Sequence, residues 1–320
     1  MWTRRAILRG GTALGALALL RVPAVAATDQ LRVALAHEPP HLDPTAGDDA
    51  ATLAVAYANL FEGLTHIDEH GQALPGLAKS WTVSGDGLTY TFQLQDVVRY
   101  HDGTSFDAAH AVYSLDRLRH STDNPGRAAY ASIVDVGAVD AATLKVTLRR
   151  PQPGFLVDLA RPAAVIVAPE SADNNRRVPI GTGPFALVDW QAGNGIALER
   201  NEDYWGLHPR INAATFLFVA DAAAGLAAVM TGQIDGYPDF PAPALLEQVR
   251  GSPAVTITAG KGPDGAARTG LWNSQLTGMW ADAPFESCVL AGIRWKSDNG
   301  VPDAGPAPPP VAAPGESTDE

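Results

Sequence analysis

The sequence of 320 residues has a single cysteine, Cys288, which excludes an intramolecular disulfide and a metal or iron–sulfur site built from several cysteines. Basic residues are also few, because 23 Lys and Arg stand against 35 Asp and Glu, for a formal net charge of −12 at pH 7. A nucleic-acid partner needs a basic surface that meets phosphates, so this composition argues against one. Beyond the N-terminal region, no apolar run reaches the roughly 20 residues needed to cross a bilayer.

What the sequence does contain is typical of a folded globular protein. Hydrophobic residues make up 46% of the chain and charged residues 18%, so a core can be filled and wholesale disorder is excluded. The length suits roughly two domains of about 150 residues each.

The first 27 residues have the composition of an export signal. Their only charges are arginines, and they include a short apolar run over 13–20 and then the small-x-small triplet Ala24-Val25-Ala26. This pattern predicts a signal peptide cleaved after Ala26 and a location in the periplasm. The segment Thr3-Arg4-Arg5-Ala6-Ile7-Leu8-Arg9 resembles a twin-arginine signal, with an ordinary secretory signal as the alternative.

The hydrophobic periods of the remaining chain predict both strands and helices. Strands are expected over 31–36, 88–94, 144–148, 185–190 and 196–199, the last two as a hairpin. Helices are expected over 50–64, 108–119 and 222–231. Because the two types do not alternate strictly, the expected fold class is α/β of the mixed α+β kind.

Two short motifs match catalytic or cofactor signatures but lack the required backbone. His37-Glu38-Pro39-Pro40-His41 has the H-E-x-x-H spacing of zinc proteases, whose histidines must share one helix face. Two consecutive prolines disfavour that helix, so we expect a polar extended loop. Gly181-Thr182-Gly183-Pro184-Phe185-Ala186 resembles a dinucleotide-binding loop, but a strand pattern follows it where a helix is needed.

A set of stretches between residues 30 and 258 carries a more specific signal in its order and spacing. They are His41–Pro44, Tyr57–Leu64, Pro75–Trp81, Asp86–Phe92, Tyr100–Ala108, Val112–Ser114, Gly181–Phe185, Glu199–Gly206 and Met230–Asp235. Together they resemble the family 5 extracellular solute-binding proteins, which are the peptide-, dipeptide- and nickel-binding components of ABC importers.

The resemblance implies a periplasmic-binding-protein-like type II fold, in which two lobes close on a ligand and a small domain is inserted into one lobe. It assigns residues 28–45 and 165–258 to lobe I and residues 46–164 to the inserted domain. It also implies a non-catalytic monomer without metal or cofactor. Its partners would be a peptide or other small solute and the ABC permease subunits in the inner membrane.

The resemblance implies that residues in the loops 38–41 and 237–240, and in the segment 182–183, contact the ligand. The residues concerned are Glu38, Pro40, His41, Thr182, Gly183, Tyr237, Asp239 and Phe240.

The family pattern is not visible after Thr258. Residues 259–300 show no sustained hydrophobic period and are expected to be poorly structured, and residues 301–320, with six prolines, are expected to be a disordered tail. We interpret this change as a frameshift or rearrangement that leaves the second main lobe missing. Two alternatives stay open: a truncated, non-transporting remnant with little ligand affinity, and a secreted metal-dependent hydrolase that uses His37, Glu38 and His41.

Overall fold

The computed structural model describes residues 30–68, 71–121, 124, 126–261, 267–274 and 294–295. The predicted signal peptide, Cys288 and the predicted Pro-rich tail lie outside these residues. Within them, no helix is long and apolar enough to cross a membrane.

A large mixed sheet forms one body of the structure, and its described part has eight strands in the order β14-β12-β13-β11-β1-β10-β9-β8. The bounds are β1 (Gln30–Leu35), β8 (Phe185–Gln191), β9 (Gly195–Arg200), β10 (Ala213–Phe218), β11 (Gly236–Tyr237), β12 (Val255–Lys261), β13 (Ala267–Asn273) and β14 (Arg294–Trp295). At its centre β1 pairs in parallel with both β10 and β11, whereas the pairs further out are antiparallel. The hairpin predicted from the sequence is confirmed as β8 and β9.

The second body is a smaller antiparallel sheet, whose described part has four strands in the order β4-β5-β7-β6. The strands are β4 (Ala78–Val83), β5 (Thr89–Leu94), β6 (Ile133–Asp140) and β7 (Thr143–Leu148), with a separate hairpin of β2 (Thr65–Ile67) and β3 (Ala73–Pro75). The helical segments are α2 (Ala108–His120), η1 (Arg127–Tyr130), α3 (Phe155–Asp158) and η2 (Pro162–Ala164). As predicted, Asp107 caps α2, accepting hydrogen bonds from the backbone of Ala109 and His110.

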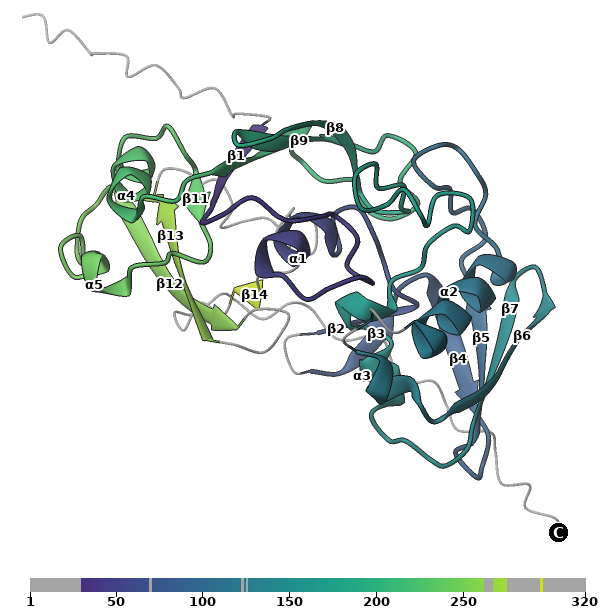
Figure 1. The fold of residues 1–320 in the computed structure, drawn as a ribbon. Helices are drawn as coiled ribbons and strands as arrows, with labels where there is room; N and C mark the ends of the chain where they lie inside the picture. The colour runs from purple at the N-terminus through teal and green to yellow at the C-terminus, as the bar shows by residue number, and fades with distance from the viewer. Residues whose placement is uncertain are drawn as a thin grey trace, which may run out of the picture.

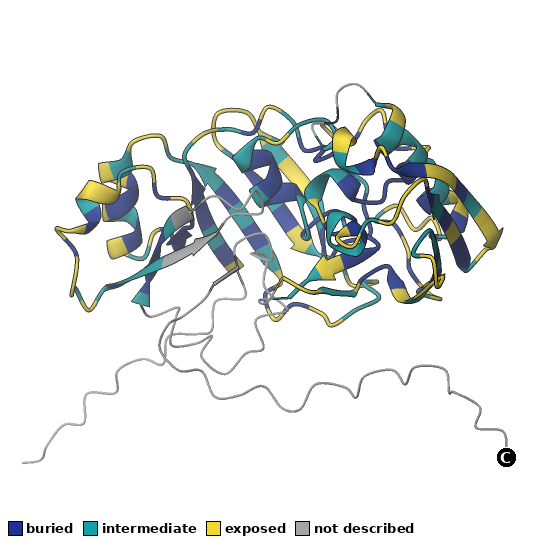
Figure 2. Cartoon of the chain, turned by 90° about the horizontal axis from the view of Figure 1, so that it is seen from below, coloured by how far each residue is buried: buried dark blue, intermediate teal, exposed yellow. Residues whose placement is uncertain are grey.

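The two bodies lie at opposite ends of an elongated molecule (Figure 1). Helices α4 (Ala222–Met230) and α5 (Pro243–Leu246) lie with β12 and β13 at one end, and α2 lies with β4–β7 at the other. Helix α1 (Ala50–Ala56) lies between them. Buried residues gather on the inner strands and on the helix faces that meet them, whereas exposed residues lie on the loops and on outer strands such as β4 and β6 (Figure 2).

The buried side chains fall into separate hydrophobic clusters. One joins the small sheet to α2 and includes Phe92, Leu115 and Val146, and another joins α1 to the large sheet and includes Val55 and Phe216. Because Val55 belongs to the large-sheet cluster, the packing favours a domain boundary after α1. The division of the chain into lobe and inserted domain otherwise stays a prediction.

Helix α1 ends earlier than its hydrophobic stripe predicts. The sequence favours a helix over 50–64, but α1 ends at Ala56, and the chain turns through Ala58, which has a φ of 61°. The side-chain amide of Asn59 donates to the carbonyl oxygens of Ala54 and Val55, at 3.1 Å in each case. The end of the helix is therefore satisfied by a side chain, and the prediction for 57–64 is wrong.

The expectation that regular structure stops near Thr258 is also wrong. Strand β12 continues to Lys261, and β13 covers Ala267–Asn273 and pairs with β12 along its length. In β13, Leu271 and Trp272 are buried against the rest of the sheet. Their burial comes from strand pairing and tertiary packing, which a local hydrophobic period does not report.

The segment 181–183 passes very close to the backbone after α1. A Cβ on Gly181 would lie 1.9 Å from the carbonyl oxygen of Leu60, and a Cβ on Gly183 would lie 2.3 Å from that of Asn59. The Leu60 oxygen cannot easily move, because it accepts a hydrogen bond from the Gly183 amide at 3.0 Å. Only glycine fits at these two positions.

This contact predicts that Gly181→Ala lowers the free energy of unfolding by at least about 2 kcal/mol, because the added methyl group displaces backbone. Gly137→Ala is the matched control, since a Cβ at Gly137 meets nothing within 4 Å. Urea unfolding of the two variants measures the difference. Equal midpoints would contradict the close approach.

Candidate solute-binding edge

The ends of the parallel strands bring two of the predicted loops to one edge of the large sheet. Leu35 is level with Phe218, and Val33 is level with Gly236, so the chain leaves β1, β10 and β11 at nearly the same height. The loop 36–41, the residues 219–221 and the loop 238–240 therefore lie along one edge. We call this edge, together with the β8–β9 turn at 192–194, the C-terminal edge. Crevices outside the carboxyl ends of parallel strands are common ligand sites in α/β proteins.

Glu38 is held at this edge by the β8–β9 hairpin. Its Oε1 accepts a hydrogen bond from Nε1 of Trp190 at 2.8 Å, and its Oε2 accepts one from the backbone amide of Gly193 at 2.8 Å. The guanidinium of Arg177 stacks on the Trp190 ring, 4.3 Å from its centroid. These partners lie more than 130 residues from Glu38 along the chain, so no local sequence pattern indicates them.

Two of the three polar side chains of the H-E-x-x-H spacing bind different partners, and Nδ1 of the third, His41, accepts or donates no hydrogen bond among the described residues. Nε2 of His37 contacts Oδ2 of Asp49 at 2.8 Å, while Glu38 binds the hairpin. His41 is half-buried, and burial together with the positive charge of Arg176 lowers its pKa. The segment is not helical, as the two prolines predict, and the described residues contain no group of three His, Cys, Asp or Glu that could hold a metal ion.

The loop after β11 contributes less exposed surface than the sequence suggested. Tyr237 is fully buried and its hydroxyl donates to the carbonyl oxygen of Val219 at 2.6 Å. Phe240 is also buried, with its ring perpendicular to that of Tyr237 at 5.3 Å. Asp239 between them is exposed, as is Pro40 in the neighbouring loop. Of Tyr237, Asp239 and Phe240, only Asp239 is exposed.

Thr182 and Gly183 do not lie at the C-terminal edge. They precede β8, which runs in the same direction as β1, so they lie at the opposite edge of the sheet. Thr182 is fully buried, and its hydroxyl donates to Oε2 of Glu62 at 2.9 Å. Gly183 packs against the backbone of Asn59 and Leu60. Their contacts are structural, and the structure separates them from the other candidates.

Glu62 accepts hydrogen bonds from three side chains that belong to two distant motifs, Gly181–Phe185 and Glu199–Gly206. Besides Thr182, the Tyr204 hydroxyl donates to its Oε1 at 2.8 Å and the Trp205 indole donates to its Oε2 at 2.9 Å. The residue as a whole is half-buried, but protein atoms enclose its carboxylate. This burial raises the pKa of Glu62 to about 7 from an ordinary value near 4.5, although all three hydrogen bonds oppose the shift.

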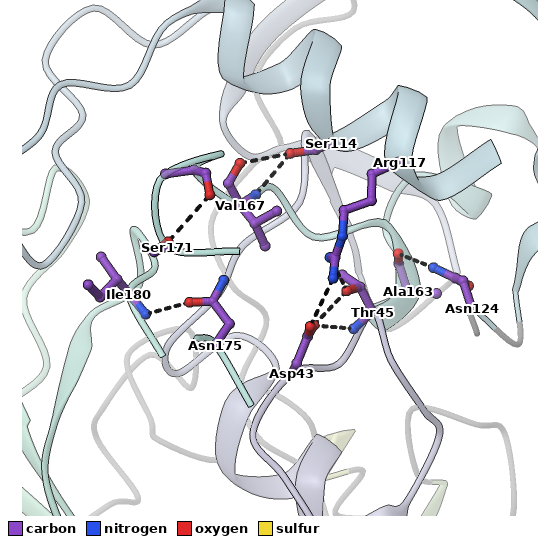
Figure 3. A network of polar contacts seen from close by, with 11 residues as sticks. Asp43, Thr45, Ser114, Arg117, Asn124, Ala163, Val167, Ser171, Asn175 and Ile180 are labelled. Carbon is purple, nitrogen blue, oxygen red and sulfur yellow. Dashed lines mark hydrogen bonds and ion pairs between the residues drawn. The ribbon is translucent and has the colours of Figure 1, made fainter. Parts of the chain in front are cut away.

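A second polar junction fixes the start of the chain to α2 (Figure 3). Asp43 is only 1% exposed, and its carboxylate accepts hydrogen bonds from the amide and hydroxyl of Thr45. It also forms an ion pair with Arg117 of α2 at 3.2 Å. Arg117 also donates to the Thr45 hydroxyl. Beside this junction is a cavity of about 10 Å³, room for roughly one water molecule and too small for a solute. The predicted motif His41–Pro44 is thus a structural element at Asp43.

Residues 72–280 match the family described as bacterial extracellular solute-binding proteins, family 5 Middle. The chain belongs to this family. The match extends beyond Thr258, so the sequence analysis ended the resemblance too early. The mixed α/β class and the periplasmic-binding-protein-like fold expected from the resemblance are confirmed.

Relatives and solved structures match over about half of their own length. Glutathione-binding protein GsiB of Escherichia coli O1:K1 / APEC is 33% identical over 256 residues, which cover 76% of this chain and 49% of that protein. The binding protein AgaA from A. tumefaciens R10, in complex with agropinic acid, has a TM-score of 0.67 and 28% identity, covering 73% of this chain and 48% of that one. DppA from Helicobacter pylori, in complex with peptide STSA, has a TM-score of 0.66 and 25% identity, covering 73% and 51%.

The raised pKa of Glu62 predicts a pH-dependent stability. The folded state holds the proton more tightly than the unfolded state, so the stability that Glu62 contributes falls as the pH rises from about 4.5 to about 7 and is level above that. The loss attributable to Glu62 is at most about 3 kcal/mol. Glu62→Gln can accept from Thr182 and Trp205 and donate to Tyr204, so the variant should lose this dependence.

Unfolding measured between pH 4.5 and pH 8 tests the prediction, with Glu202→Gln as the control, because that exposed carboxylate pairs with Arg200 at the surface. Parallel curves for wild type and Glu62→Gln would show that Glu62 titrates normally.

The Asp43 junction predicts that Arg117→Gln lowers the free energy of unfolding by about 2 kcal/mol or more, since it leaves a buried carboxylate without its counter-charge. Arg250→Gln removes an arginine from an exposed pair with Glu247 and should change stability by less than about 0.5 kcal/mol. Thermal unfolding of both variants gives the comparison, and a small effect at Arg117 would argue against the junction.

Proposed function

We propose that this chain is the solute-binding component of an ABC transporter, that it binds a peptide or another small solute, and that it catalyses no reaction. The observation that carries the proposal is the C-terminal edge, where loops from three parallel strands and one hairpin turn meet with Glu38 and Asp239 on their surface. Membership of the solute-binding family supports it.

The chemistry named for the relatives sets the range of solutes. GsiB is named as glutathione-binding, DppA was solved with a peptide as an ABC transporter-associated protein, and NikZ from Campylobacter jejuni was solved with Ni(L-His). These are small polar molecules built from amino acids. We propose the same class here, with ABC permease subunits in the inner membrane as partner and a monomer as the binding form.

The ligand residues that we propose are those at the C-terminal edge: Glu38, Pro40, His41 and Asp239. Tyr237 and Phe240 are buried beneath this edge, so they determine the shape of the loop and do not contact the solute. Thr182 and Gly183 belong to the junction with Glu62, and we no longer propose them as ligand contacts. The loop 36–41 is fixed at its far end by Asp43.

We also propose the location and processing that the N-terminal sequence suggests. Residues 1–27 would act as a signal peptide of the twin-arginine type, cleaved after Ala26, and the mature chain would act in the periplasm. The large sheet, with the start of the chain, residues 165–261 and β13, would form the lobe, and the small sheet with α2 would form the inserted domain.

Ligand-dependent stabilisation tests the proposal. A solute that binds the folded chain at 100 times its Kd adds about 2.7 kcal/mol, which for a chain of this size raises Tm by roughly 5 °C or more. The probes are glutathione, a set of di- and tripeptides and Ni(L-His). Glu38→Ala should reduce the shift, whereas Glu202→Ala, on the exposed surface, should retain it.

The absence of any shift with millimolar concentrations of all these probes would contradict solute binding by this chain. It would favour the remnant without ligand affinity.

A further inference from the structure

Trp190 connects two opposite charges at the C-terminal edge. Its indole N–H donates to Oε1 of Glu38 at 2.8 Å, and its ring carries the guanidinium of Arg177 at 4.3 Å. Trp190 is the last residue but one of β8, which packs against the core of the large sheet, and its ring is partly buried there. Trp190 is therefore a rigid element in contact with two flexible charged side chains.

We infer that Trp190 is a positioning residue, which fixes the Glu38 carboxylate in the orientation that receives a solute. This inference rests on the proposed function. A glutamate side chain has several rotatable bonds, and ordering it on binding costs free energy that weakens the complex. The bonds from Trp190 and from the amide of Gly193 hold one carboxylate oxygen each, so the order exists before the solute arrives.

The same geometry defines the chemistry that Glu38 can receive. Each carboxylate oxygen has two acceptor positions, and Trp190 and Gly193 occupy one on each oxygen. The remaining positions are acceptors with a negative charge, which suit the N–H donors of an ammonium group. Within the solute class proposed above, the group that fits these positions is the free amino group of an amino acid or peptide.

Arg177 adds a second feature to this arrangement. Its side chain is exposed and makes no ion pair among the described residues, and the Trp190 ring supports it from below. An exposed guanidinium without an ion pair can bind a carboxylate on the same solute. Trp190 thereby holds the Glu38 carboxylate and the Arg177 guanidinium next to each other.

Trp190→Phe isolates the hydrogen bond, because phenylalanine retains an aromatic face for Arg177 but has no N–H for Glu38. Trp81→Phe is the matched control, since Trp81 is a half-buried tryptophan in β4 whose indole makes no hydrogen bond within the described residues. Two readouts on the full chain are needed. One is amide hydrogen exchange of residues 36–41 and 192–194, and the other is the affinity for glutathione and for glutathione acetylated on its amine.

We expect Trp190→Phe to increase the exchange rate of the Gly193 amide and of the 36–41 loop about fivefold, and Trp81→Phe to leave both unchanged. Affinity for glutathione should fall about fivefold, while affinity for the acetylated form, which lacks the ammonium group, should change less than twofold. Unchanged exchange would overturn the inference, as would an equal loss of affinity for both ligands, because that indicates a general structural effect.

If the wild-type chain binds neither ligand, glutathione fails as a solute for the proposed function. The exchange readout then decides the inference on its own, since it needs no ligand. Increased exchange confined to the two segments would support the positioning role of Trp190, and unchanged exchange would remove it.

Discussion

The contact between the segment 181–183 and the chain after α1 is the constraint on which the rest of the structure depends. Glycines allow this segment to lie against the backbone of Asn59 and Leu60, and Thr182 then reaches the Glu62 carboxylate. On its other side, the ring of His101 accepts a hydrogen bond from the Gly181 amide at 3.2 Å and contacts the Gly183 carbonyl oxygen at 3.1 Å. This one segment thus connects the large sheet to the small one.

The contacts at Glu62 and Asp43 hold the structure together and lie apart from the proposed binding edge. Several of the motifs that identify the family meet at Glu62 or at Asp43, which are enclosed carboxylates that each accept three hydrogen bonds. Such positions need particular residues because an unpaired polar group in the interior is costly. The C-terminal edge has a different character: His37, Pro40, Asp239 and the turn 192–194 are exposed, and Glu38 is held there by two hydrogen bonds that leave acceptor positions open. Under the proposed function, solute selection can change at this edge while the contacts at Glu62 and Asp43 stay the same.

Local patterns predicted the elements whose signals are contained in neighbouring residues, such as α2 with its cap at Asp107 and the hairpin of β8 and β9. They failed where distant residues decide the outcome. Asn59 ends α1 early, and pairing with β12 and β11 makes a strand of β13, although its residues show no clear period. In the site, the sequence indicated Glu38 but not Trp190 or Gly193. The sequence also suggested Thr182 and Gly183 as ligand contacts. A motif indicates that particular residues are needed at a position, but not whether they are needed for packing or for binding.

The account makes one claim above the others: solute meets the chain at the C-terminal edge, away from the 181–183 junction. Amide chemical shifts measured by NMR while a binding solute is added test this claim most directly. The account predicts that the changes concentrate in residues 36–41, 192–194 and 238–240, with little change at Gly181, Gly183 and Phe185. Changes centred on the junction, with an undisturbed C-terminal edge, would contradict it.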